Sequence, residues 1–366
     1  MKSLKICGCG VRFFFPASGR SRKEAEKAPR IDSFCRREFM FQYSVILGNV
    51  GQCSDRYMTC GYGRPFELPE LFERVASIPG VTGIEYIGNW HLSDKTVHQI
   101  AELQKQYGFR AVAIIPDHFG TPIWSKGAFT APDAKVRKAA VEETVRMAEL
   151  AREIGCPMLS LWNGQDGYDY PLQADYTDAA RWLADGLGEC CARIPDQKIS
   201  LEYKPKEPRN HCFLPNVWAA LTLIAESGAK NMGVTIDVGH SLEAYENVSE
   251  AACAAMSRGR LFHFHMNDNW RLWDDDMIAG SVHTIEFIEL FYWLRKLGYS
   301  GYISTDQYPY RENSRDAVAQ TVKWMQTFEK ITERIDSQQM QEILDRNDAV
   351  ASNELLRRLM FGWLEP

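Results

Sequence analysis

The sequence predicts an α/β protein built as a (β/α)₈ barrel with a short C-terminal helical extension. From residue 40 onward, a short apolar run is followed by a longer segment with helical spacing, and this unit recurs eight times. The apolar runs lack polar alternation, as a parallel sheet covered on both faces requires. A doubly wound open sheet is the alternative fold, but it is expected to have a Gly-rich turn after the first strand, and the sequence has none there. Eight units close naturally into a barrel.

Each element is defined by its length and by the spacing of its apolar residues. The expected strands are five to eight residues long, whereas the expected helices have ten residues or more. Thr130 or Asp133 is available to start the third helix. The strands are expected at 41–48, 83–87, 109–115, 157–162, 198–203, 232–237, 261–266 and 301–305. In the same order, the helices are expected at 67–78, 93–107, 132–154, 176–194, 215–227, 248–257, 284–297 and 316–335.

The two ends of the chain fall outside the barrel, which is expected to span residues 40–335. Residues 1–39 hold ten Lys or Arg against four Asp or Glu, and their apolar cluster is too short and too charged for a secretory signal. We interpret them as a disordered leader, or as the result of a start codon upstream of a natural Met40, with a transit-like targeting segment as the alternative. Residues 336–366 carry helical spacing and would pack on the barrel wall or on another subunit.

The composition is that of a globular protein and excludes several classes. Of the 366 residues, 45% are hydrophobic and 25% are charged, which allows a large core. The net charge of −6 argues against a nucleic-acid partner, which would need a basic face. No apolar run approaches the ~18 residues of a membrane span. The ten cysteines are scattered without zinc-site spacing, so we expect reduced thiols and a cytoplasmic location.

Acidic and histidine side chains stand at the ends of four neighbouring strands of the predicted barrel. Because barrel active sites lie at the C-terminal face of the strands, these side chains would meet at one rim. A single acid at a strand end is usually a helix cap or an ion-pair partner, but four groups in matched positions are hard to explain in that way. Three carboxylates with one imidazole suit a hard or borderline divalent ion. The four residues are Glu202, Asp237, His265 and Asp306.

The stretch at 261–283 supplies further negative charge to this rim. It contains three consecutive carboxylates, and two such charges ~4 Å apart repel by roughly 4 kcal/mol at an effective dielectric near 20 unless a cation lies among them. A further histidine, His240, follows Asp237 by three residues. We therefore predict a second metal position made by His240, Asp274 and Asp276, with Asp237 shared. The alternative is a solvated acidic loop or a helix cap.

Four motifs carry these residues: EYKPKEP at 202–208, DVGH at 237–240, FHFHMND at 262–268 and DDDMIAGS at 274–281. In combination they resemble the motifs of the xylose-isomerase-like sugar isomerases and epimerases, and the likeness is closest to L-rhamnose isomerase. The resemblance covers roughly residues 40–330 in the order of the strand–helix units.

This resemblance implies a metal-dependent carbonyl chemistry. The first ion, held by the four strand-end groups, would grip two sugar oxygens, and the second would carry a water or hydroxide. Lys204 would face the carbonyl end of the substrate and stabilise developing oxyanion charge. Glu202 and His240 would also belong to the catalytic group. Manganese is the expected ion, with magnesium, cobalt or zinc as alternatives, at one or two ions per subunit.

Residues that follow strands two to four would complete the substrate pocket. Trp162 would stack on the apolar face of a sugar while Gln165 takes hydroxyl hydrogens, although a core position is the alternative for Trp162. His118 follows the third strand, where the family often places a ring-opening histidine, so it is a candidate acid or base, or else a surface histidine. Trp90, after the second strand, and Asp268, after the seventh, are further candidates for substrate contacts, and Asp268 could instead tie loops together.

These features predict a divalent-metal-dependent sugar isomerase that interconverts an aldose and a ketose by hydrogen transfer between C1 and C2 of a neutral monosaccharide. The alternative is an epimerase, or a lyase or deglycosidase, acting on a keto-sugar or keto-glycoside at the same rim. A nuclease-type or non-catalytic barrel is disfavoured, because a nuclease would want a basic rim. We expect a small carbohydrate as the substrate, no nucleic-acid or membrane partner, and a homo-oligomer (dimer or tetramer), with a hetero-oligomer as the alternative.

Overall fold

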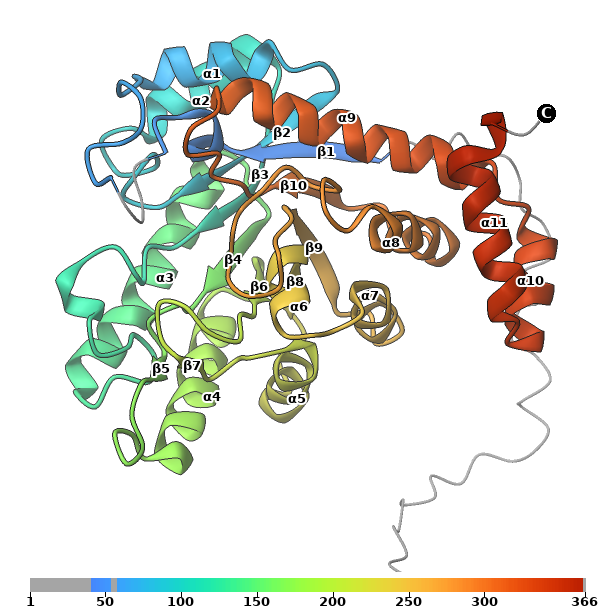
Figure 1. Ribbon diagram of the computed structural model, residues 1–366. Coiled ribbons are helices and arrows are strands. Elements are labelled where there is room, and N and C mark those ends of the chain that lie inside the picture. The colour runs from blue at the N-terminus through green and yellow to red at the C-terminus, as the bar shows by residue number, and fades with distance from the viewer. Residues whose placement is uncertain (1–40, 54–57, 365–366) are drawn as a thin grey trace, which may run out of the picture. The chain divides into compact units, whose positions relative to one another are not determined.

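The computed structural model of the protein describes residues 41–53 and 58–364 (Figure 1). These described residues belong to one compact unit. The predictions for residues 1–39 lie outside the described residues. None of the helices in the described part of the chain has the length and apolar character needed to cross a membrane.

Eight parallel strands close into a barrel, which confirms the predicted fold (Figure 1). Neighbouring strands pair in the order β1-β10-β9-β8-β6-β4-β3-β2, and β1 pairs with both β10 and β2, so the barrel has no free edge. Because the strands are parallel, their carboxyl ends meet at one face. The strands are β1 (Gln42–Ile46), β2 (Val81–Ile87), β3 (Arg110–Ile115), β4 (Met158–Trp162), β6 (Lys198–Glu202), β8 (Met232–Asp237), β9 (Leu261–Met266) and β10 (Tyr302–Thr305).

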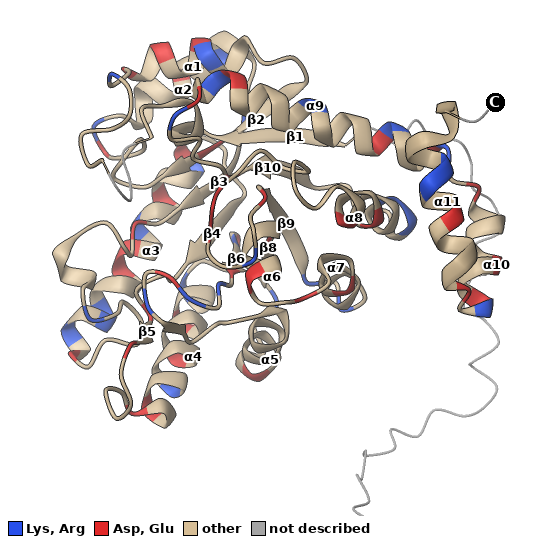
Figure 2. Cartoon of the chain, viewed as in Figure 1, with Lys and Arg blue, Asp and Glu red and all other residues tan. Residues whose placement is uncertain are grey.

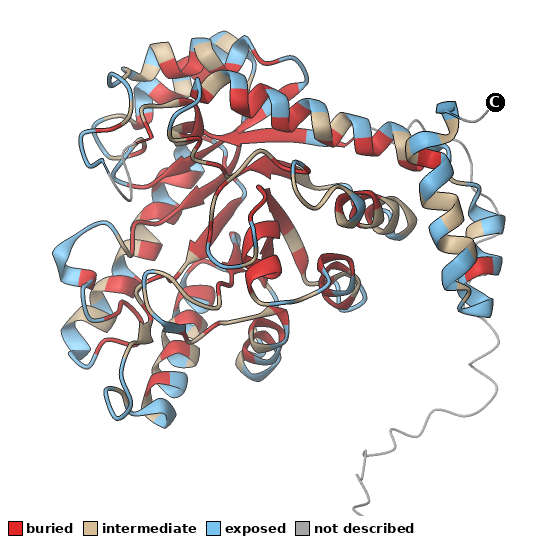
Figure 3. Cartoon of the chain, in the orientation of Figure 1, coloured by how far each residue is buried: buried red, intermediate tan, exposed pale blue. Residues whose placement is uncertain are grey.

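The predicted helices surround the barrel, each with a buried inner face and an exposed outer face (Figure 3). Charged residues of both signs are spread over their outer surfaces (Figure 2). The third helix begins at Ala134 and is capped by Asp133, one of the two predicted starting residues, whose side chain accepts a hydrogen bond from the Lys135 amide at 2.8 Å. The helices are α1 (Leu68–Ala76), α2 (Val97–Tyr107), α3 (Ala134–Glu153), α4 (Tyr176–Arg193), α5 (Val217–Ser227), α7 (Val248–Met256), α8 (Thr284–Leu297) and α9 (Ser314–Glu333).

Several short elements were not predicted, because they are too short to show a period. Helix α6 (Val238–Glu243) starts directly at the end of β8, where the Asp237 carboxylate accepts a hydrogen bond from the His240 amide at 2.8 Å. The strands β5 (Gly167–Tyr168) and β7 (His211–Cys212) form a small antiparallel ribbon. Two 3₁₀ helices, η2 (Leu47–Val50) and η3 (Pro122–Trp124), follow β1 and β3.

The C-terminal extension consists of α10 (Ser337–Arg346) and α11 (Ala349–Phe361), followed by η4 (Gly362–Leu364). Figure 1 shows this pair beyond the C-terminal end of α9. Lys296 of α8 donates a hydrogen bond to Gln341 of α10 at 2.9 Å, so the extension contacts the outer helices of the barrel. Only Ile343 and Leu359 of these two helices are buried.

Polar side chains, rather than the usual branched aliphatic ones, fill part of the barrel interior. On one side, Thr235 donates a hydrogen bond to Ser200 at 2.7 Å and lies 2.9 Å from the Ser160 hydroxyl. On the other side, the hydroxyls of Ser44 and Ser304 are hydrogen-bonded to each other. All five side chains are fully buried. The interior therefore carries a hydrogen-bonded polar layer below the carboxyl ends of the strands.

Gly83 of β2 marks a point where the interior leaves no room for a side chain. A Cβ atom at this position would collide with Val112 and lie 2.7 Å from the Tyr302 ring.

We expect Gly83→Ala to lower the free energy of unfolding by about 1–3 kcal/mol, because the neighbours would have to move. The matched control is Gly188→Ala in α4, where an added Cβ would have no atom within 4 Å apart from its chain neighbours and its own helix backbone, and where the change should add about 0.5–1 kcal/mol. Urea unfolding measures both, and equal effects at the two positions would contradict this account of the interior.

Candidate active site

The structure brings the four strand-end groups together at the carboxyl face of the barrel. Glu202 ends β6, Asp237 ends β8, His265 lies in β9 and Asp306 follows β10. One ligand atom from each of the four lies within 4.8 Å of the others. The Nδ1 atom of His265 lies 3.2 Å from a Glu202 oxygen and 3.3 Å from an Asp306 oxygen. Three of the side chains are almost fully buried, and that of Asp306 is 18% exposed.

The charges of this group fit a divalent cation. Burial raises the pKa of Asp237 to about 7, although the nearby His240 opposes the shift. Burial also raises the pKa of Asp306. The pKa of Glu202 is lowered instead, because the imidazoles of His265 and His240 outweigh the effect of burial. The buried Nδ1 atoms of His240 and His265 have no hydrogen-bond partner. Orphaned imidazole nitrogens that face several carboxylates are the donor set that a divalent ion satisfies.

A second group adjoins the first and shares Asp237 with it. Ligand atoms of Asp237, His240 and Asp274 lie within 4.8 Å of one another. The Nε2 atom of His240 is 3.2 Å from an Asp274 oxygen, and its Nδ1 atom is 3.3 Å from a Glu202 oxygen. Burial would lower the pKa of His240, but Asp237 and Asp274 raise it to about 9. Asp276, which we predicted as a third new ligand here, is not in this group, although it lines the adjoining cavity.

A cavity of about 620 Å³ opens beside the two groups. The Lys204 side chain lies in its wall, where the ammonium is 2.7 Å from an Asp274 oxygen and 3.5 Å from a Glu207 oxygen. The residues that line the cavity are Ile46, Ile87, Trp90, Ile115, Phe119, Trp162, Gln165, Glu202, Lys204, Glu207, Pro208, His240, Trp273, Asp274, Asp276, Asp306 and Tyr308.

The cavity has one polar wall and one apolar wall. Ile46, Ile87 and Ile115, at the ends of β1, β2 and β3, form one cluster with Phe119 packed against it. Trp162 continues this wall, because its ring lies 4.8 Å from that of Phe119. The indole nitrogen of Trp162 is buried and has no hydrogen-bond partner. The apolar residues and the carboxylates line the same cavity, and Lys204 lies where they meet, with its ammonium 5.4 Å from the centre of the Trp162 ring.

Comparison with known proteins assigns the fold and the family. Residues 72–328 match the model of the xylose isomerase-like TIM barrel family. The chain belongs to this family. The xylose isomerase of Thermus thermophilus is 26% identical over 231 residues, which cover 62% of this chain and 60% of the relative. The chain thus spans less than two thirds of the length of that relative, and the likeness to L-rhamnose isomerase in particular remains a prediction.

Solved structures of family-like barrels superpose over most of the chain. A D-tagatose 3-epimerase-like protein has a TM-score of 0.63 at 22% identity, covering 80% of this chain and 98% of its own. The 3-keto-D-glucoside 4-epimerase of E. coli has a TM-score of 0.60 at 20% identity, covering 72% and 95%. At these identities the likeness concerns the fold.

Two predicted site residues, His118 and Asp268, belong neither to the cavity wall nor to the ligand groups of this family member. His118 is fully buried between Trp124 and Phe129, with its Nε2 atom 3.2 Å from the Ala140 carbonyl oxygen. Burial lowers its pKa to about 4, and its ring faces helix α3 rather than the substrate space. The backbone after β3 turns this side chain outward, so the structure does not support the predicted acid or base role.

Asp268 binds its own loop instead of a substrate. Its carboxylate accepts hydrogen bonds from the amides of Val282 and His283 at 2.8 and 3.0 Å. It also lies 2.7 Å from the His283 ring, and it is fully buried. Of the two interpretations from the sequence, loop closure is the one that the structure supports. The predicted contacts Trp90, Trp162, Gln165 and Lys204 do line the cavity.

Sequence reasoning missed Glu85, a buried acid in the middle of β2. Its carboxylate lies 2.6 Å from the Nε2 atom of His263 and 3.2 Å from that of His265. The signal was present, because a lone acid inside an apolar strand run needs a buried partner. Glu207 and Trp273, which also line the cavity, were missed because they lie on irregular loops.

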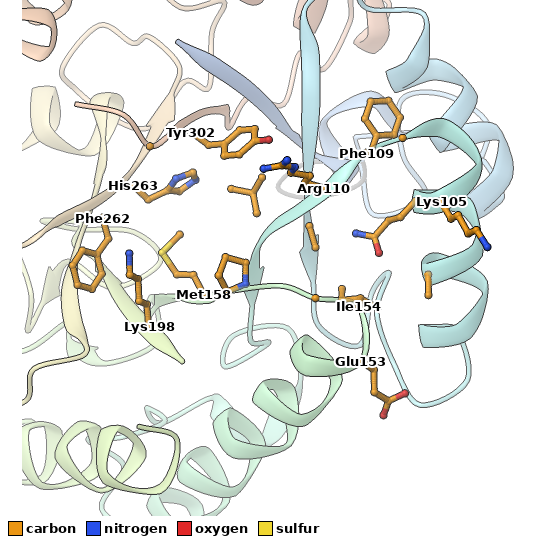
Figure 4. A pocket seen from close by; sticks show the side chains of 18 residues that line it. Lys105, Phe109, Arg110, Glu153, Ile154, Met158, Lys198, Phe262, His263 and Tyr302 are labelled. Atoms are coloured by element: carbon orange, nitrogen blue, oxygen red, sulfur yellow. The ribbon is translucent and has the colours of Figure 1, made fainter. Parts of the chain in front are cut away.

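A larger cavity of about 870 Å³ lies at the opposite, amino-terminal end of the strands. Figure 4 shows the side chains of Arg110, Tyr302 and His263 directed toward one another there. Among the described residues that line this larger cavity, none belongs to the two groups of potential metal ligands at the carboxyl face. The smaller cavity is therefore the candidate active site.

Glu243 of α6 lowers the free energy of unfolding of the metal-free protein by an amount that depends on pH. Both carboxylate oxygens are buried without a hydrogen bond, and the nearest cation, Lys206, is 3.7 Å away. Burial, followed by the charge of Asp274, raises the pKa of Glu243 from 4.5 to about 7. Between these two values the folded protein binds more protons than the unfolded chain, so stability falls as the pH rises.

We expect Glu243→Gln to stabilise the metal-free protein at pH 8 by on the order of 3 kcal/mol and to have little effect at pH 4. The reason is that the amide resembles the protonated acid and carries no charge at high pH. The control is Glu226→Gln on the exposed surface of α5, which should change stability by less than ~0.5 kcal/mol at both pH values. Urea unfolding at the two pH values measures this, and a gain that does not depend on pH would refute it.

Proposed function

We propose that the protein is a divalent-metal-dependent sugar isomerase, which interconverts an aldose and a ketose by hydrogen transfer between C1 and C2. The observation that carries the proposal is the convergence of two metal-ligating groups, joined through Asp237, at the wall of one cavity. The membership in the xylose isomerase-like family supports it.

The donor set suits manganese first, and magnesium, cobalt or zinc as alternatives, because it consists of carboxylates and imidazoles without thiolates. Glu202, Asp237, His265 and Asp306 would hold one ion, and Asp237, His240 and Asp274 a second. A divalent ion bound there would polarise a carbonyl group and lower the pKa of a coordinated water or hydroxyl.

The side chains of the cavity have separate tasks in this reaction. Lys204 would donate a hydrogen bond to the carbonyl oxygen as negative charge develops on it, and Asp274 holds the ammonium in place. Trp162 would pack on the apolar face of the sugar and donate its unpaired indole N–H to a hydroxyl. The isoleucine cluster at the ends of β1, β2 and β3 would exclude water from the reacting carbons.

A second candidate function is favoured by the apolar wall. A free sugar carries hydroxyls on most of its carbons and gains little from a surface of three isoleucines and a phenylalanine. At the mouth, Trp90 and Trp273 line the cavity while 47% and 39% exposed. Such a site would also suit an epimerase or lyase that acts on a keto-sugar or keto-glycoside with an apolar aglycone.

One experiment tests both candidates. Metal-free protein is loaded with Mn²⁺, its metal content is measured, and it is then incubated with free aldoses, ketoses and 3-keto-glycosides. Ketose formation from a free aldose supports the isomerase, whereas release of an aglycone or inversion at one carbon, without activity on free aldoses, replaces it by the second candidate. Retention of full metal content and activity in both Glu202→Gln and Asp237→Asn would refute the metal site itself.

For Lys204, we expect replacement by Met to lower kcat by about 10²–10³-fold, because one fixed donor to the developing oxyanion is lost. The neighbouring Lys206→Met is the control, since Lys206 is paired with the Leu272 carbonyl oxygen and with Glu243 outside the cavity. Its kcat should stay within about threefold of the wild-type value. Steady-state kinetics on Mn²⁺-loaded protein of equal metal content decides, and an unchanged kcat for Lys204→Met would exclude the assigned role.

A further inference from the structure

Glu85 occupies an unusual position inside the barrel. It belongs to β2, its side chain is fully buried, and it reaches across the interior to β9. One of its oxygens lies 2.6 Å from the Nε2 atom of His263, and the other lies 3.2 Å from the Nε2 atom of His265. The Ser304 hydroxyl also donates a hydrogen bond to the first oxygen. Each carboxylate oxygen thus has a donor of its own.

All three contacts of the Glu85 carboxylate come from groups that can donate a hydrogen bond, as an ionised carboxylate requires. A carboxylate can only accept hydrogen bonds, so both Nε2 atoms must carry hydrogen. The position of that hydrogen decides what the opposite nitrogen of each ring can do.

For His265, the opposite nitrogen is the one that faces the candidate metal site. Its Nδ1 atom lies 3.2 Å from Glu202 and 3.3 Å from Asp306, and it has no hydrogen-bond partner. With hydrogen held on Nε2, the lone pair of the neutral ring is on Nδ1, where it can bind an ion. A ligand histidine of this kind usually gives its other N–H to a carboxylate, which orients the ring and raises its basicity.

We infer that Glu85 is a positioning residue for the metal site, which fixes the tautomer and the orientation of His265 through the Oε2···Nε2 hydrogen bond. The inference rests on the proposed metal-dependent function. His263 and Ser304 hold the other oxygen of Glu85, so they stabilise the positioning residue rather than contact the ion. The polar layer of the barrel interior, from Ser44 through Ser304 to Glu85, thereby supports the centre from below.

An ion bound by Glu85, His263 and His265 themselves is the competing interpretation, because their ligand atoms also lie within 4.8 Å of one another. Nitrogen and oxygen ligands about 2.1 Å from a common ion lie about 3 Å apart or more. The 2.6 Å contact between His263 and Glu85 is shorter than that and matches a direct hydrogen bond. Hydrogen bonding accounts for all three side chains.

The test compares Glu85→Gln and Glu85→Leu with the wild type in Mn²⁺ affinity, measured by competition with a chelator, and in the visible spectrum of the Co²⁺ form. Loss of the carboxylate should weaken metal binding by about 10–100-fold, with Leu at least as damaging as Gln, because Gln keeps one acceptor for His265. The Co²⁺ spectrum should change, since the imidazole is no longer held in one orientation.

The matched control is Glu329→Gln. Glu329 is also buried and also uses one oxygen for each of two donors, the Phe41 amide and the Tyr43 hydroxyl, but it lies away from the metal-ligating groups. This variant should lose stability and keep the metal affinity and the Co²⁺ spectrum of the wild type. If Glu85→Gln behaves in the same way, Glu85 is only a structural residue and the inference falls. If the wild type itself binds no divalent ion, the proposed function falls with it.

A measurement on the unmodified protein guards against variants that do not fold. Nitrogen-15 NMR of histidine-labelled, zinc-loaded protein distinguishes the two tautomers of each ring. The result expected is hydrogen on Nε2 for both His263 and His265, with slow solvent exchange, and the two signals are assigned from the loss of one of them in His263→Gln. Hydrogen on Nδ1 of His265 would overturn the inference.

Discussion

The main physical constraint on the structure is a group of buried carboxylates at the carboxyl face of the barrel, which the surrounding residues have to hold close together. Glu202, Asp237, Asp274 and Asp306 approach one another where water is largely excluded, and within the described residues two imidazoles and Lys204 offset their charge. Such an arrangement is costly for a protein that uses it only to fold. The geometry becomes understandable if the barrel serves to hold these groups apart at fixed distances until a positive ion or a substrate lies among them.

The surrounding structure limits how far these side chains can move. Asp237 caps helix α6 with one oxygen and accepts a hydrogen bond from the Asn267 side chain at 2.8 Å with the other. His265 is held from below by Glu85, and the Asp274 carboxylate is held by Lys204. The apolar wall lines the same cavity beside these groups. Rigid support of this kind is what separates a working centre from a loose cluster of acids.

The period of the sequence was sufficient to predict the barrel, because eight buried strands and eight amphipathic helices each leave a repeated pattern. It was also sufficient for the strand-end groups, since parallel strands bring their carboxyl ends to one face. It could not show where a side chain points after the backbone leaves a strand. His118 turns outward and Asp268 turns into its own loop for this reason. Glu85 was overlooked because a strand pattern gives no information about which strand lies across the barrel.

The short helix α6 has a consequence for the choice of ion. Because the helix begins at Asp237 through the carboxylate itself, the position of this side chain is set before any ion arrives. A centre that is assembled in advance offers nearly the same cage to each divalent ion of similar size. Binding strength among first-row metals at such a centre would then follow their general order of affinity, in which manganese is the weakest, rather than the shape of the cage. The metal found in the living cell would accordingly be decided by which ions the cell supplies.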